Sequence, residues 1–142
     1  LGALSAGGLL TLAVVSQAVL SVEPWFSPRH IVPLAGMIFA SAMNTVSLAA
    51  ERQQAERDKG NSYIKTRRIA LRAALIPIVN SLFAVGLVSL PGMMTGQILS
   101  GVSPLLAAKY QIMVMAMLFG ASGLSAALYL VLDHHSVARA ER

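Results

Sequence analysis

The chain has 142 residues, of which 56% are hydrophobic and only 12% are charged, and its net charge at pH 7 is +5. The charged share is about half that of an ordinary soluble domain, so the composition favours an integral membrane protein. Nucleic-acid binding is disfavoured because the basic residues flank hydrophobic segments, and the absence of cysteine excludes a disulfide framework and a thiolate metal site.

The first apolar segment runs from Leu1 to Val22 without a charged residue. About 20 apolar residues are enough to cross a bilayer as a helix, so this segment is the first predicted span. The chain does not begin with Met, and no charged segment precedes the apolar run, so a signal peptide fits poorly. We therefore expect residues 1–142 to be one transmembrane domain that forms the C-terminal portion of a longer protein.

The second predicted span, Ile31 to Ala50, continues without a helix breaker into a strongly charged segment. Arg52 and Glu56 are four residues apart and are expected to pair on one helix face. The helix is predicted to leave the membrane and to end near Gly60-Asn61. The loop 51–72 contains seven of the eleven Lys and Arg residues, so the positive-inside rule predicts that it is a cytoplasmic helical loop and that both termini are cytoplasmic.

Between Arg72 and Lys109 there is no charged side chain. We predict a third span over Ala73–Leu90 and a fourth over Leu105–Leu132, followed by a polar tail. The intervening segment, Pro91–Gly101, is too short to span the membrane and begins with a Pro-Gly break, so we predict a broken or re-entrant segment that is buried in protein or lines a cavity. The predicted fold class is all-α, a polytopic helical membrane protein with about four transmembrane helices.

Polar and glycine residues in this region are candidates for a transport pathway or an outer gate. They are Asn44, Asn80, Pro91, Gly92, Thr95, Gly96, Gln97, Lys109 and Gln111. Gly92 and Gly96 permit dihedrals that other residues resist, and Thr95, Gln97 and Asn80 are the nearest side chains expected to bond the freed backbone groups. The alternatives are that the asparagines only join helices, that Lys109 only extends to the external surface, and that Pro91–Gly101 is only a tight extracellular turn.

No enzymatic motif and no P-loop occurs, so the chain is not expected to be an enzyme or to hydrolyse ATP by itself. No metal site is predicted: the methionines are better explained by helix packing than by soft-ion ligation. The predicted spans contain no carboxylate, so they offer no oxygen cage for a hard cation. Two alternatives to a transport subunit stay open at this point, a non-transporting helical membrane scaffold or assembly protein and an ATP-independent channel.

The segment from Leu87 to Gly101, with the string Leu-Pro-Gly-Met-Met-Thr-Gly-Gln at 90–97, resembles the signature of the FetB-type ABC transporter permeases. This family includes the aluminium-tolerance permeases of plants. The segments Tyr110–Met113, Pro33–Ile38 and Ala73–Pro77 match the same family, so the resemblance covers most of the chain. In this family the cytoplasmic loop normally carries a longer run before the segment that corresponds to Ala73–Pro77, whereas here only residues 56–72 fill that place.

The resemblance implies the permease subunit of an ABC exporter in the bacterial inner membrane, related to metal and with iron export as the bacterial precedent. It implies a second copy of the permease and a separate cytoplasmic ABC ATPase that binds ATP and Mg, with no cofactor in this chain. The cytoplasmic loop would then transmit ATP-driven movement. The residues expected to couple it to the ATPase are Glu51, Glu56, Arg57, Arg67 and Arg68.

Overall fold

The computed structural model describes residues 2–14, 28–85 and 91–140. The helices in these ranges are α1 (Gly2–Val14), α2 (Pro28–Asp58), α3 (Tyr63–Ala84), α4 (Gly92–Leu99) and α5 (Pro104–Ala140). The predicted all-α class is therefore confirmed.

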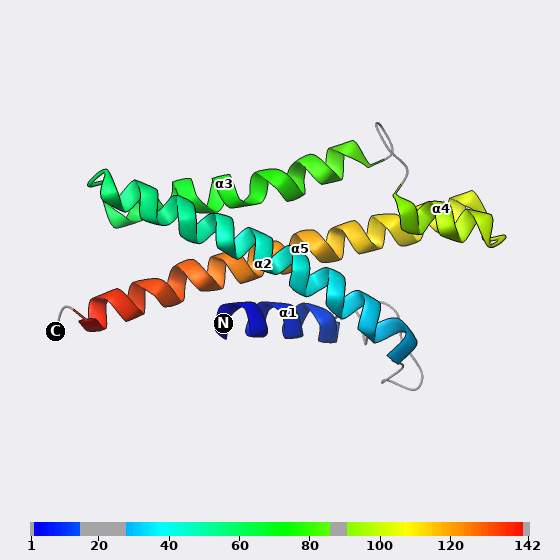
Figure 1. Ribbon diagram of the computed structural model, residues 1–142, viewed down its shortest axis with the longest axis horizontal. Helices are drawn as coiled ribbons and strands as arrows, with labels where there is room; N and C mark the ends of the chain where they lie inside the picture. Colours follow the sequence, from blue (N-terminus) through cyan, green and yellow to red (C-terminus); the bar gives the residue numbers. More distant parts are fainter. Residues whose placement is uncertain (1, 15–27, 86–90, 141–142) are drawn as a thin grey trace.

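The longest helix, α5, is the centre of the fold, because each of the other four helices packs against it. In Figure 1, α2 crosses α5 near its middle, and α3 runs back alongside α2. The turn between α2 and α3 and the C-terminal end of α5 lie at the left of this view, whereas α4 and the start of α5 lie at the right. The charged segment 51–72, which forms the hairpin between α2 and α3, and the broken segment 91–101 are therefore at opposite ends of the helix bundle.

Among the described residues, two helices are long and apolar enough to cross a membrane, α2 over Val32–Asp58 and α5 over Pro104–Asp133. The predicted spans over residues 1–22 and 73–90 extend into residues 15–22 and 86–90, which lie outside the described residues, so the number of four spans stays a prediction. Large apolar side chains on the surface suit contact with lipid or with further membrane helices. Phe83 and Ile112, for example, are each 70% exposed.

The buried core consists mainly of small side chains, which allow close approach of the helices. Seven of its alanines are at most 1% exposed: Ala42, Ala49, Ala70, Ala74, Ala107, Ala121 and Ala126. The Oγ atoms of Ser41 on α2 and Ser122 on α5 are 2.8 Å apart, which is a hydrogen bond between the two helices. A Cβ atom on Gly7 of α1 would lie 3.0 Å from the backbone of Ser125 on α5, so α1 and α5 meet with no room for a side chain.

Three helices extend beyond the predicted spans. α2 begins at Pro28, α3 begins at Tyr63 rather than near Ala73, and α5 continues to Ala140. The predicted spans followed the edges of apolar segments, but Lys and Arg are good helix formers and do not end a helix. The basic residues before Ala73 therefore belong to the same helix as the third predicted span.

Candidate functional site

The turn between α2 and α3 has the hydrogen bonds of a Schellman motif, which ends a helix with a left-handed residue. The N–H of Gly60 donates to the carbonyl oxygen of Arg57 (2.8 Å), and the N–H of Asn61 donates to that of Glu56 (3.3 Å). Gly60 has a φ of 73°, which glycine adopts without a Cβ clash. The predicted end of the second helix near Gly60-Asn61 is confirmed, and the charged loop 51–72 is a helical hairpin.

The Glu56 carboxylate holds this hairpin end together. Its side chain is only 5% exposed, and it forms ion pairs with Arg52 (3.1 Å) and Lys59 (2.9 Å). Asn61 donates a hydrogen bond of 2.7 Å to its second oxygen. The hydrogen bond from Lys59, helped by the nearby charges of Lys59 and Arg52 and by Asn61, holds the pKa of Glu56 below its ordinary value although burial acts in the opposite direction. The predicted Arg52–Glu56 pair is confirmed.

A second set of polar contacts fastens the hairpin to α5. The guanidinium of Arg57 forms an ion pair with the Asp133 carboxylate, and the buried Gln53 amide donates to the same carboxylate oxygen at 3.2 Å. From α3, the hydroxyl of Tyr63 donates to the carbonyl oxygen of Leu130 at 2.8 Å. The hairpin is thus bonded to the C-terminal part of α5 from both of its helices.

The remaining predicted coupling residues lie on the outside of the hairpin. Glu51 is exposed and lines a small groove of about 190 Å³ with Leu48, Arg52, Ala55 and Ala73. Arg67 and Arg68 are also exposed. The structure therefore divides the five predicted residues: Glu56 and Arg57 bond within the chain, whereas Glu51, Arg67 and Arg68 face outward.

The broken segment forms a short helix, α4, that packs against α5. Pro91 is its N-cap, and the side chain and the N–H of Thr95 both donate to the Pro91 carbonyl oxygen, at 3.3 and 3.0 Å. The C-terminal end repeats the Schellman pattern: the N–H of Gly101 donates to Ile98 (3.0 Å), and that of Val102 donates to Gln97 (2.9 Å).

Gly92 and Gly96 do not use the dihedral freedom that glycine permits. Gly92 and Gly96 lie within the helix, and it is Gly101 that has a positive φ, of 93°. The sequence motif located the Pro-Gly break correctly. A left-handed residue is needed only where the helix ends, and that position is Gly101. The Thr95 hydroxyl donates to a carbonyl oxygen that already accepts the Thr95 N–H, so the expected bonding of freed backbone groups by Thr95, Gln97 and Asn80 stays a prediction. Asn80 is exposed and makes no hydrogen bond to α4 in the described part of the chain.

Two amide side chains near this end of the bundle have unpaired oxygens. The Oε1 atoms of Gln97 on α4 and Gln111 on α5 are buried without a hydrogen-bond partner among the described residues. Lys109, one turn from the start of α5, is exposed, as is Asn44 on α2. Thus α4 and the first turns of α5 bring together Pro91, Gly92, Thr95, Gly96, Gln97, Lys109 and Gln111 at one end of the bundle, whereas Asn44 and Asn80 belong to other helices.

Sequence reasoning missed the contacts between the hairpin and α5. Asp133 was assigned to a polar tail, and Gln53 and Tyr63 were not singled out. One signal was available, because an acidic residue directly after an apolar span lies on the same side of the membrane as the basic loop and is a candidate partner for it. Among the described residues, no group of three His, Cys, Asp or Glu side chains is placed to hold a metal ion.

The helices and their exposed apolar surface define an all-α membrane protein with a charged hairpin at one end. The chain belongs to the uncharacterised protein family UPF0014, whose family model matches residues 1–137. No solved structure matches the chain.

Three relatives illustrate the family. The chain is 42% identical to "Probable iron export permease protein FetB" of Escherichia coli, with 87% of this chain and 52% of the relative covered. It is 41% identical to "UPF0014 membrane protein slr1647" of Synechocystis, covering 86% and 54%, and 33% identical to "Protein ALUMINUM SENSITIVE 3" of Arabidopsis thaliana, covering 84% and 48%. The chain spans about half the length of the curated relatives it matches.

Proposed function

We propose that this chain is part of the permease subunit of an ABC exporter in the bacterial inner membrane. A separate ABC ATPase would bind ATP and Mg on the cytoplasmic side, and a second copy of the permease would complete the transmembrane pathway. Metal export, with iron as the first substrate to test, is supported by the name of the Escherichia coli relative.

The observation that carries this proposal is the bonded hairpin. A membrane scaffold needs no rigid charged extension, but a subunit driven by an ATPase needs one that transmits movement to its spans. Glu56 and Arg57 give the hairpin its shape and its attachment to α5. Glu51, Arg67 and Arg68 are exposed. Glu51 and Arg67 are the residues proposed to contact the ATPase, whereas Arg68 lines a separate groove.

The same helix connects the two ends of the bundle. α5 carries Asp133 at the hairpin end, and its other end packs against α4. A movement of the hairpin would therefore reach the segment from Pro91 to Gly101 through one continuous helix, which supports the proposal that α4 and the start of α5 form the outer gate.

The test uses the full-length permease and its ATPase in proteoliposomes loaded with iron. Glu51→Lys and Arg67→Glu are expected to weaken binding of the ATPase and ATP-dependent iron export while the permease stays folded. Gln54→Ala, at an exposed position of α2, is the matched control. Orientation is measured separately with Gln54→Cys, which should be labelled only from the cytoplasmic side.

Two outcomes would reject the proposal. Iron flux that continues without ATP and without the ATPase would indicate a channel. A complex that forms but never moves iron or another metal in a panel would indicate a scaffold or assembly protein.

A further inference from the structure

The basic residues of the hairpin divide into two groups. Arg52 and Lys59 pair with Glu56, and Arg57 pairs with Asp133. Four others make no ion pair or hydrogen bond with any described residue and are exposed: Lys65, Arg67, Arg68 and Arg72. The uncompensated positive charge of the hairpin is therefore concentrated on the first turns of α3.

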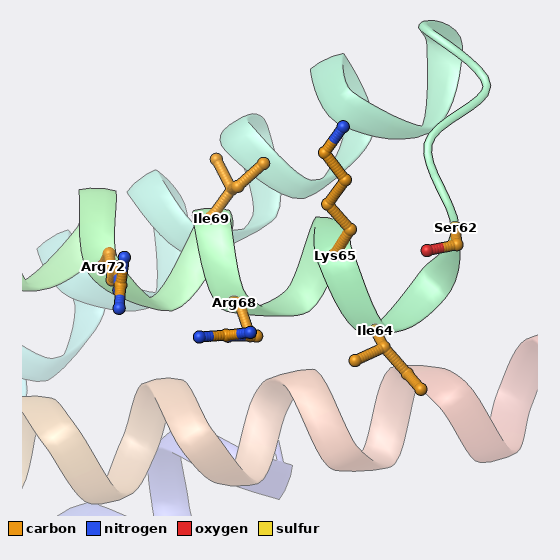
Figure 2. Close-up of a pocket in the computed structure, with 6 residues that line it drawn as sticks. All are labelled: Ser62, Ile64, Lys65, Arg68, Ile69 and Arg72. Carbon is orange, nitrogen blue, oxygen red and sulfur yellow. The ribbon is translucent and has the colours of Figure 1, made fainter.

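Three of these four cations line one groove. Lys65, Arg68 and Arg72, together with Ser62, Ile64 and Ile69, surround an open groove of about 530 Å³. Figure 2 shows Lys65 and Ile69 on one side of the α3 axis and Ile64 and Arg68 on the other. The basic residues follow i, i+3 and i+7 spacing, so they lie on one broad face of α3, with Lys65 and Arg68 toward its two edges. This face lies opposite the buried Thr66, Ala70 and Ala74. Arg67 is exposed on the same helix but does not line the groove.

We propose that this groove binds the headgroup phosphate of an anionic phospholipid. Lys65 and Arg72 are about 10 Å apart along the helix axis, so the groove is longer than the headgroup region on one side of a bilayer, which is about 5–8 Å deep. Arg72 is the last charged residue before the neutral segment that extends to Lys109, so the groove begins where the apolar part of α3 begins.

The groove chemistry favours a lipid over an acidic protein surface. Arginine guanidinium groups bind phosphate oxygens in a two-pronged geometry. The apolar side chains of Ile64, which is 72% exposed, and the half-buried Ile69 lie beside the cations. Ile69 is three residues from Arg72, at the membrane side of the groove, so it would contact the glycerol and the upper acyl chain of a bound lipid, whereas it gains nothing from an aqueous carboxylate surface. This inference needs only a membrane protein and does not depend on the proposed export function.

The test compares two adjacent arginines in the full-length permease. Binding of phosphatidylglycerol, phosphatidylcholine and inorganic phosphate is measured by native mass spectrometry of the protein in detergent, for Arg68→Gln and for the matched control Arg67→Gln. Removing one groove cation should weaken phosphatidylglycerol binding about fivefold, and Lys65→Gln/Arg68→Gln/Arg72→Gln should weaken it further. Arg67→Gln should bind as the parent does, and phosphatidylcholine binding should not change.

Each other outcome would overturn the proposal. Equal losses in Arg67→Gln and Arg68→Gln would indicate diffuse attraction to negative charge rather than a groove. Inorganic phosphate that competes as strongly as the lipid would indicate a free-phosphate site. Unchanged lipid binding in the triple variant, combined with loss of ATPase assembly, would make the groove a protein contact. Because the three side chains are exposed and make no bonds in the described chain, circular dichroism should show unchanged helicity.

Discussion

Arg57 on α2 and Asp133 on α5 form an ion pair that joins residues 76 positions apart in the chain. Gln53 donates to the same carboxylate from the same face of α2. Through these contacts the charged hairpin is part of the helix bundle rather than a separate surface extension, and its orientation relative to α5 is fixed.

Breaking this pair should loosen the hairpin. Arg57→Gln and Asp133→Asn are each expected to lower the free energy of unfolding by about 1 kcal/mol, because the two side chains are partly exposed and water screens part of their attraction. Unfolding by sodium dodecyl sulfate in mixed micelles measures the change. The reversed pair Arg57→Asp/Asp133→Arg should recover part of the loss. Single variants as stable as the parent would show that the pair contributes nothing to the fold.

The Glu56 carboxylate should make the hairpin sensitive to acid. Its pKa is lowered in the folded state from an ordinary value of 4.5, chiefly by the hydrogen bond from Lys59. A carboxylate with a lowered pKa contributes its full stabilisation above the ordinary value and loses it as pH falls below 4.5 through the folded pKa. Tryptic cleavage within the hairpin, measured after brief acid exposure, should therefore rise below that pH.

The Glu56→Gln variant provides the control for this acid effect. It should be cleaved faster than the parent at neutral pH, because the ion pairs with Arg52 and Lys59 are lost. It should then show a weaker further change on acidification. An identical acid response in the parent and in Glu56→Gln would assign the effect to other groups.

The turn after α4 should not tolerate a side chain at its glycine. Gly101 has a φ of 93°, so Gly101→Ala is expected to cost about 1–2 kcal/mol of stability from backbone strain. The control is Gly120→Ala in α5, where nothing lies within 4 Å of an added Cβ and alanine favours a helix. Thermal unfolding in detergent distinguishes the two. Equal midpoints for the two variants would argue against a left-handed residue at position 101.

The gate hypothesis can be tested at Gly92 and Gly96 without disturbing the fold of this chain. Nothing lies within 4 Å of a Cβ added at either glycine, so Gly92→Leu and Gly96→Leu should leave expression and stability within about 0.5 kcal/mol of the parent. Transport by the full-length protein should fall at least severalfold if α4 moves against other parts of the permease. Transport at the parent rate in both variants would leave α4 as a connector only.

Local patterns in the sequence were sufficient for the helical class, for the end of α2 near Gly60 and for the Arg52–Glu56 pair. Each depends on residues within a few positions of one another, where helix periodicity and turn chemistry decide the outcome. The extent of the helices was less well predicted. The predicted spans ended where the apolar segments end, but α3 and α5 continue through the polar residues beyond those ends.

The sequence by itself determined a helical membrane chain with a basic hairpin and a Pro-Gly break, because apolar run length, charge distribution and helix breakers are local properties. Only the tertiary structure decided which cations are neutralised. Arg57 has no acidic residue three or four positions away on α2, and α3 carries no acidic residue at all, so helix spacing offers a partner to neither Arg57 nor Arg68. The crossing of α2 over α5 brings Asp133 to Arg57, whereas Arg68 faces outward on α3. Contacts between helices distant in sequence depend on how the helices pack, which no local pattern specifies.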